Sequence, residues 1–267
     1  MRKRFGQSLR LGVSPYDVAL LKVSRWGSPR ADVVAEVALG GTGMDAIGAA
    51  ARQLLSDFGS AGWPLSVVLA DDLVRMWQVT PPRGSTRLAD LEAAAALRFQ
   101  SLYGESAGQW TFSAGWDTGA PFLAAAMPRE LLALLQQAAF DSRATIVEVL
   151  PQFVAGWNRW RSAILPDAWY GLVQAQVLTI GALEGGRVRA LRAAAIPEHA
   201  PADWLGQHVA REALRLNMAA PARLFVSGQA PATWNNSTAA LPCVLLGSPA
   251  PGQLSAAARL AATGILS

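Results

Sequence analysis

Long uninterrupted runs of apolar residues are missing from this sequence, although 52% of its residues are hydrophobic. A helix needs roughly 20 consecutive apolar residues to cross a bilayer. The two best windows stop early, residues 93–97 at Arg98 and residues 122–127 at Pro128. The basic start Arg2-Lys3-Arg4 has no apolar stretch behind it and is therefore not typical of a secretory signal. We expect a cytoplasmic protein that does not span the membrane.

Cysteine and histidine are scarce as well. Cys243 is the single cysteine, which excludes an internal disulfide and is typical of a reducing compartment. The histidines, His199 and His208, have a spacing that fits no common metal site. Asp71-Asp72 follows an apolar run where a carboxylate pair could hold a cation, but a polar turn is the preferred interpretation because no further acids lie nearby. The sequence predicts no metal and no cofactor.

Charged residues make up only 16% of the chain, and the basic ones are dispersed. Disorder requires low hydrophobicity and high net charge, so this composition predicts a folded core. Despite a formal net charge of +4, only the terminal basic run is a cluster, which disfavours a nucleic-acid partner. Gly40-Gly41-Thr42-Gly43 lacks the lysine of a phosphate-binding loop. Without a credible catalytic set, the chain is predicted to act by binding other proteins.

Apolar runs alternate with helical patterns along the whole chain, which predicts an α/β fold with mixed sheets flanked by helices. The turn Glu184-Gly185-Gly186-Arg187 indicates a hairpin. A junction at residues 166–169 divides the chain into a lobe of residues 1–165 and a lobe of residues 166–267 that open alike. Strands are expected at 8–13, 17–24, 31–39, 65–70, 73–79, 110–116, 122–127, 145–150, 172–183, 188–196, 223–227 and 242–246, and helices at 44–58, 88–102, 128–140, 151–160, 201–217 and 254–263.

This order of elements resembles the actin-like ATPase superfamily, with its ribonuclease H-like lobes, and more closely the cytoplasmic pilus-assembly family PilM. The resemblance rests on residues 9–23 (LRLGVSPYDVALLKV), 64–82, 88–112 and above all 121–157 (PFLAAAMPRELLALLQQAAFDSRATIVEVLPQFVAGW), where strand, helix, strand and helix follow in family order. The cytoplasmic domain of the type II secretion L protein is similar in plan. The resemblance implies a two-lobed fold with an inserted subdomain at about residues 80–121.

The chain departs from the superfamily at each nucleotide motif. An actin-like ATPase has an acid in its first hairpin to organise a metal, and turns whose N–H groups cradle phosphate. Arg10 stands at the acid's position, and the turn that includes Gly12 and Ser14 contains Pro15, which has no N–H. The second hairpin has Gln174 without an acid, and the late glycine pair is reduced to Gly228. The second lobe is also reduced, because residues 197–222 hold one helix where the full fold inserts a subdomain.

The resemblance therefore implies a degenerate nucleotide site made of Arg10, Gly12, Ser14, Gln174 and Gly228, and a protein that is not an enzyme. PilM-like proteins accept a short peptide of a membrane partner in a groove beside the inserted subdomain. Aromatic side chains dominate interface hot spots, so the predicted partner-binding residues are Phe99, Tyr103, Trp110 and Phe112.

The leading hypothesis is a non-catalytic adaptor of a type IV pilus or related secretion machine. It would lie in the cytoplasm and reach the inner membrane only through an assembly protein whose cytoplasmic peptide it docks. An ATP-binding protein with unorthodox ligands is the first alternative. A housekeeping α/β protein whose actin-like plan is accidental is the second.

Overall fold

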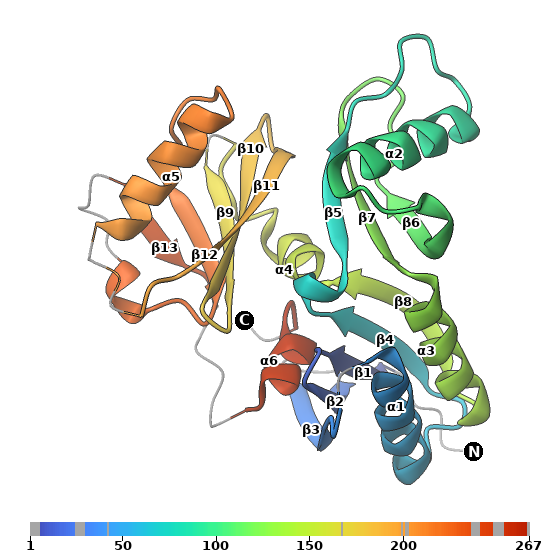
Figure 1. The fold of residues 1–267 in the computed structure, drawn as a ribbon. Coiled ribbons are helices and arrows are strands. Elements are labelled where there is room, and N and C mark those ends of the chain that lie inside the picture. Colours follow the sequence, from blue (N-terminus) through green and yellow to red (C-terminus); the bar gives the residue numbers. More distant parts are fainter. Residues whose placement is uncertain are drawn as a thin grey trace.

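The computed structural model describes residues 6–24, 30–41, 43–166, 168–198, 200, 203–235, 241–247 and 254–265. These residues form two lobes, each built on a five-stranded mixed sheet, and a smaller subdomain with a three-stranded sheet (Figure 1). The predicted two-lobed α/β architecture is confirmed. Within the described residues, no helix is both long enough and apolar enough to cross a membrane.

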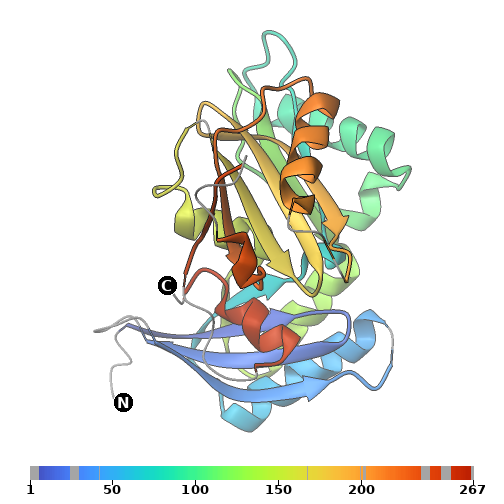
Figure 2. The same ribbon diagram turned by 90° about the vertical axis from the view of Figure 1, so that its left-hand side faces the viewer.

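The first lobe is built on a sheet of order β3-β2-β1-β4-β8, in which β1 pairs antiparallel with β2 and parallel with β4. The interior strand β4, between β1 and β8, is buried along nearly its whole length, as its continuous apolar sequence requires. Helices α1 and α3 cover one face, and α6 covers the other (Figure 2). The elements are β1 (Gln7–Val13), β2 (Asp17–Ser24), β3 (Arg30–Ala38), β4 (Pro64–Leu69), β8 (Thr145–Pro151), α1 (Met44–Phe58), α3 (Arg129–Asp141) and α6 (Ala256–Ala262).

The second lobe is built on a sheet of order β11-β10-β9-β12-β13, with α5 on the face away from the subdomain and α4 on the side toward the first lobe (Figure 1). Helix α5 is the only helix described between β11 and β12. The elements are α4 (Gln152–Trp160), β9 (Trp169–Gln174), β10 (Val177–Glu184), β11 (Arg187–Ala195), α5 (Trp204–Arg215), β12 (Leu224–Gly228), the 3-10 turn η3 (Ala232–Trp234) and β13 (Cys243–Leu245).

One strand predicted from the sequence is in fact two. The apolar run at residues 172–183 is broken by a two-residue turn, Ala175-Gln176, which joins the antiparallel strands β9 and β10. Both turn residues have positive φ, 45° and 66°, as a two-residue hairpin that matches the strand twist requires. Glycine or asparagine normally marks such a turn, and their absence here hides the turn in the sequence.

The subdomain extends from the first lobe as a sheet of order β5-β7-β6, with α2 packed on one of its faces. Successive side chains along each strand point alternately to that face and to the opposite face. No helix described in the subdomain covers the opposite face. The elements are the 3-10 turn η1 (Asp71–Leu73), β5 (Arg75–Val79), α2 (Leu88–Tyr103), the 3-10 turn η2 (Ala107–Gln109), β6 (Trp110–Ala114) and β7 (Phe122–Pro128).

Helix α6 packs unusually close to the first sheet because the facing residues are small. Its buried side chains are mostly alanines, including Ala257 and Ala261, and they lie against Gly12 of β1. A Cβ atom on Gly12 would lie 2.1 Å from the Ala257 carbonyl oxygen and 2.8 Å from the Ala261 nitrogen. Glycine at position 12 is therefore required for this contact between the C-terminal helix and the N-terminal hairpin.

Candidate functional site

A groove of about 880 Å³ lies where the subdomain meets both lobes. The end of β8 forms its wall on the first lobe, helix α4 forms its wall between the lobes, and the turn between β10 and β11 forms its wall on the second lobe. The subdomain contributes the face of its sheet that α2 leaves open. Its principal lining residues are Thr111, Ser113, Leu123, Ala125, Met127, Leu132, Val149, Leu150, Val154, Trp157, Arg161, Arg187 and Val188.

Strand alternation explains why this wall is aliphatic. On β7, Phe122, Ala124 and Ala126 belong to the core beneath α2, and Phe122 and Ala126 also border the groove. Leu123 and Ala125 lie between these residues and line the groove from the open face. The same alternation on β6 places small polar side chains in the groove. A cavity of this volume lined mainly by apolar groups falls within the range of binding pockets. It is suited to an extended apolar chain rather than to a phosphorylated cofactor.

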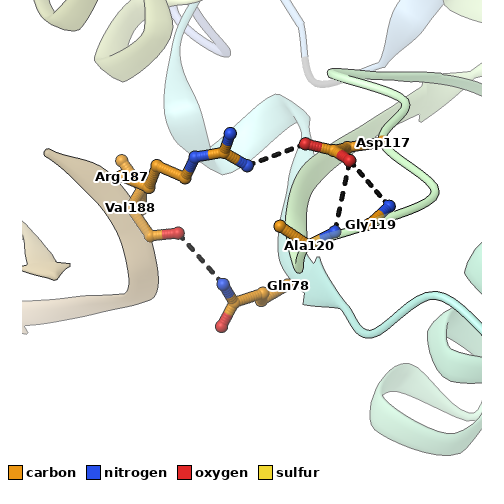
Figure 3. A network of polar contacts seen from close by, with 6 residues as sticks. All are labelled: Gln78, Asp117, Gly119, Ala120, Arg187 and Val188. Atoms are coloured by element: carbon orange, nitrogen blue, oxygen red, sulfur yellow. Dashed lines mark hydrogen bonds and ion pairs between the residues drawn. The ribbon is translucent and has the colours of Figure 1, made fainter. Parts of the chain in front are cut away.

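The groove is closed on one side by polar contacts between the second lobe and the subdomain, drawn in Figure 3 and called here the clasp. Arg187 Nη1 lies 2.7 Å from Asp117 Oδ2, and Gln78 Nε2 donates to the Val188 carbonyl oxygen over 3.1 Å. The other Asp117 oxygen accepts the N–H groups of Gly119 and Ala120. Arg187 and these N–H groups lower the pKa of Asp117 below its usual range. The ion pair is solvent-exposed, so it contributes more to geometry than to stability.

The predicted partner-binding rings lie elsewhere. Phe99 is fully buried and Trp110 is nearly so, while Tyr103 and Phe112 are half-buried. Phe99 contacts each of the other rings with centroid distances of 5.2 to 5.4 Å, and the Tyr103 hydroxyl donates to the Met76 carbonyl oxygen. These side chains form the core between α2 and the sheet. The groove is therefore not lined by the rings expected from the sequence. Phe99 and Tyr103 belong to α2, which packs on the opposite face of the sheet, and alternation along β6 turns Trp110 and Phe112 to that same face.

The residues of the predicted degenerate nucleotide site do converge, and helix α6 lies among them. Arg10 Nη2 donates to the Thr263 carbonyl oxygen over 2.7 Å, just beyond the end of α6. Gln174 Nε2 donates to the Ala256 carbonyl oxygen at the start of α6. Gly12 packs directly on the helix. The fold thus brings both hairpins to one place, where their polar groups bind protein backbone.

The remaining members of this set are also bound within the chain. The Ser14 hydroxyl hydrogen-bonds the Asp17 carboxylate, whose Oδ2 accepts the N–H of Ala257 at 3.2 Å. Gly228 has φ 88°, and a Cβ there would lie 2.2 Å from the Val173 carbonyl oxygen. A cavity of about 200 Å³ next to Gly228 is smaller than the roughly 300–1,000 Å³ of ligand pockets. These contacts leave little room for a nucleotide.

No metal centre forms within the described ranges, where no group of three or more His, Cys, Asp or Glu side chains could hold an ion. His199 lies outside those ranges, and His208 stacks on Trp204 with ring centroids 5.1 Å apart. Asp71 and Asp72 lie in the 3-10 turn η1, in agreement with a polar turn.

Asp71 has a structural role that its sequence context does not reveal. Its Oδ1 accepts the N–H of Phe153 in the first turn of α4 at 3.0 Å. This hydrogen bond joins η1, where the chain enters the subdomain, to α4, the helix between the lobes. A carboxylate near a helix N-terminus is favourable, but burial raises the pKa of Asp71 to about 7. The protonated form is therefore favoured in the folded protein relative to the unfolded chain.

We predict that Asp71→Asn stabilises the protein at pH 8 by about 1–3 kcal/mol and has little effect at pH 4. Between the unfolded pKa near 3.8 and the folded pKa near 7, the unfolded chain loses the proton while the folded protein keeps it, so wild-type stability falls as pH rises. The amide oxygen still accepts the Phe153 N–H. Urea unfolding at both pH values measures the difference, and Glu92→Gln on the exposed side of α2 controls for the lost carboxylate. Equal effects of Asp71→Asn at pH 4 and pH 8 would contradict the raised pKa of Asp71.

Comparison with known proteins identifies the fold but not a family. No protein-family model matches the sequence, and no curated protein matches it. The structure is similar to the cytoplasmic domain of EpsL, an inner-membrane component of the type II secretion system of Vibrio cholerae, with a TM-score of 0.56 at 15% identity. That similarity covers 95% of this chain and 92% of the EpsL domain.

Two further solved structures have the same plan. The PilM-PilN type IV pilus biogenesis complex matches with a TM-score of 0.61 at 12% identity over 90% of this chain and 88% of that one. A Bacteroides thetaiotaomicron protein with an actin-like ATPase fold and unknown function matches with a TM-score of 0.60 at 11% identity, over 90% of this chain and 91% of that one. At these identities the similarities show that the chain has an actin-like fold.

Proposed function

We propose that this protein is a non-catalytic cytoplasmic adaptor of a type IV pilus or related secretion assembly. It binds, in the groove between the subdomain and the lobes, a cytoplasmic peptide of an inner-membrane partner. The groove itself is the observation that carries the proposal, because its volume of about 880 Å³ is that of a binding pocket and it is lined mainly by apolar groups. It runs over an open sheet face, where an extended peptide can lie.

The similar proteins support this choice of partner. EpsL is an inner-membrane component of a secretion system, and PilM is solved in complex with PilN. Both structures match this chain over most of its length with TM-scores above 0.5. An adaptor that holds a membrane protein's cytoplasmic segment is consistent with both of them.

The contacts of α6 support the non-catalytic part of the proposal. Phosphate binding needs free N–H donors and a cation organised by carboxylates. Here the Asp17 carboxylate binds the N–H of Ala257, and Gln174 binds the carbonyl oxygen of Ala256. ATP would have to displace the helix from both hairpins. Within the part of the chain that the structure describes, no group of three or more His, Cys, Asp or Glu side chains could hold its metal ion.

Peptide binding to a groove-blocked variant tests the proposal. Labelled peptides that cover the cytoplasmic N-termini of single-span membrane proteins encoded beside this gene are titrated by fluorescence anisotropy. Ser113→Trp places a large ring on the groove wall at an exposed strand position that tolerates aromatic residues. We expect one peptide to bind the wild type and to bind this variant at least about tenfold more weakly, a loss of about 1.4 kcal/mol.

Ser101→Trp is the matched control, because Ser101 is exposed on α2 outside the groove. It should bind the peptide like the wild type. A titration of the wild type with ATP and Mg²⁺ forms the second arm and should leave the melting temperature unchanged, whereas a ligand at 100 times its Kd would add about 2.7 kcal/mol. Absence of binding by every peptide, or equal binding by both tryptophan variants, would refute the adaptor.

A further inference from the structure

The groove is apolar but not neutral. Among its lining residues the charged side chains are Asp117, Arg161 and Arg187, so one positive charge is left unbalanced after the single carboxylate is counted. Arg187 is already satisfied, because it forms the clasp with Asp117 at 2.7 Å. The unbalanced charge therefore belongs to Arg161.

Arg161 lies at the C-terminal end of α4, on the side that faces the groove. Its side chain has no ion pair or hydrogen bond among the described residues, and the residue is exposed. Arg159, two positions earlier, is not among the groove-lining residues, and its guanidinium lies 4.9 Å from the Trp160 ring centroid. A cation near a helix C-terminus favours the helix, and Arg159 also supplies that effect, so helix stability does not require Arg161 to face the groove.

Occupation of the groove changes the surroundings of Arg161. An apolar segment that covered the guanidinium would take a charge out of water without a partner, which is unfavourable. Arginine in such a position is best satisfied by a carboxylate, which accepts two parallel N–H bonds. A basic segment would add repulsion to the desolvation cost.

We propose that the occupant of the groove is an extended apolar segment that carries an aspartate or glutamate side chain paired with Arg161. This inference rests on the proposed function and deepens it, because it states the chemistry of the partner. The apolar side chains fill the space between the open sheet face and α4. The acid fixes the direction and register of the segment along the groove.

A random dodecapeptide library displayed on phage and selected on the full-length protein tests the proposal. The fusion leaves no free peptide carboxyl terminus, so any carboxylate preference reports side chains. Peptides that bind the wild type but not Ser113→Trp are groove-dependent. We expect these to be apolar with one acid, and synthetic copies with the acid replaced by its amide to bind at least about tenfold more weakly.

Charge reversal at Arg161 distinguishes direct pairing from general attraction. Selection on Arg161→Glu should replace the acid by lysine or arginine in the enriched peptides, whereas Arg159→Glu, which makes the same charge change outside the groove, should leave the acid in place. Groove-dependent peptides without an acidic preference would overturn the proposal and leave the adaptor function intact. A selection that yields no groove-dependent peptide would count against the adaptor function, and with it against this inference.

Discussion

Gly12→Ala should separate helix α6 from the first sheet and destabilise the protein by about 3 kcal/mol, as overpacking at a close contact does. A Cβ at this position would lie 2.1 Å from the Ala257 carbonyl oxygen and 2.8 Å from the Ala261 nitrogen. Both are backbone atoms of one helix, so no side-chain rotation relieves the contact. Either the helix or strand β1 must move.

Displacement of α6 has consequences beyond the contact itself. The helix carries the Ala257 N–H that Asp17 accepts, and the Thr263 carbonyl oxygen that Arg10 reaches lies just after it. The alanine substitution therefore weakens both of these hydrogen bonds between the C-terminal segment and the N-terminal hairpin. Amide hydrogen exchange in α6 should accelerate more than exchange in β4, which lies between β1 and β8 in the same sheet.

Urea unfolding and hydrogen exchange measure this effect. Gly41→Ala is the matched control, because no atom lies within 4 Å of a Cβ built on Gly41. The control should remain within about 0.5 kcal/mol of the wild type. If Gly12→Ala were equally stable and α6 equally protected, the close packing of α6 on β1 would be wrong.

Much of the first lobe is predictable because its signals are local. Continuous apolar runs give β1, β2 and β4, and a helical period gives α1. The hairpin turn at Ala175-Gln176 is not predictable in this way, since positive φ at residues other than glycine or asparagine is imposed by the surrounding sheet. The apolar run across it is continuous, and only the fold-back of β10 on β9 shows where the strand ends.

The candidate site likewise has one part that the sequence predicts and one part that it does not. The motif positions Arg10, Gly12 and Gln174 follow from the order of hairpins, and the fold does bring them together around α6. The groove has no motif, because its walls are small or aliphatic residues from separate elements. Its clasp joins Asp117 to Arg187 across 70 positions of sequence. The aromatic rings of the subdomain are conspicuous in the sequence and suggest a binding surface. The subdomain has few residues from which to build a core, so these rings pack in its core instead.

The packing between the lobes predicts an unusual response to alanine at Gly156 of α4. A helix interior normally gains up to about 1 kcal/mol when glycine becomes alanine. Here the new Cβ would lie 2.3 Å from the Tyr170 hydroxyl oxygen on β9. That hydroxyl is buried and hydrogen-bonded to the Ser227 hydroxyl at 2.7 Å, so it cannot move freely. We expect Gly156→Ala to cost about 2–3 kcal/mol instead.

A second substitution should reverse most of this loss. Tyr170→Phe removes the clashing oxygen, and the next ring atom lies 3.5 Å from the position of the new Cβ, an ordinary contact. Alone, Tyr170→Phe should cost about 1–2 kcal/mol, because it leaves Ser227 without its partner. The double variant should therefore be more stable than the sum of the single effects by about 2 kcal/mol, a coupling typical of residues in contact.

Urea unfolding of the wild type, the two single variants and the double variant measures the coupling. Gly206→Ala in α5 is the control, since a Cβ there meets only the Leu241 Cβ at 3.8 Å, and it should be neutral or slightly stabilising. Additive effects of Gly156→Ala and Tyr170→Phe would show that α4 and β9 are not in close contact. Because α4 also forms a wall of the groove, loss of this contact in Gly156→Ala should weaken peptide binding as well, and Tyr170→Phe should restore it in the double variant.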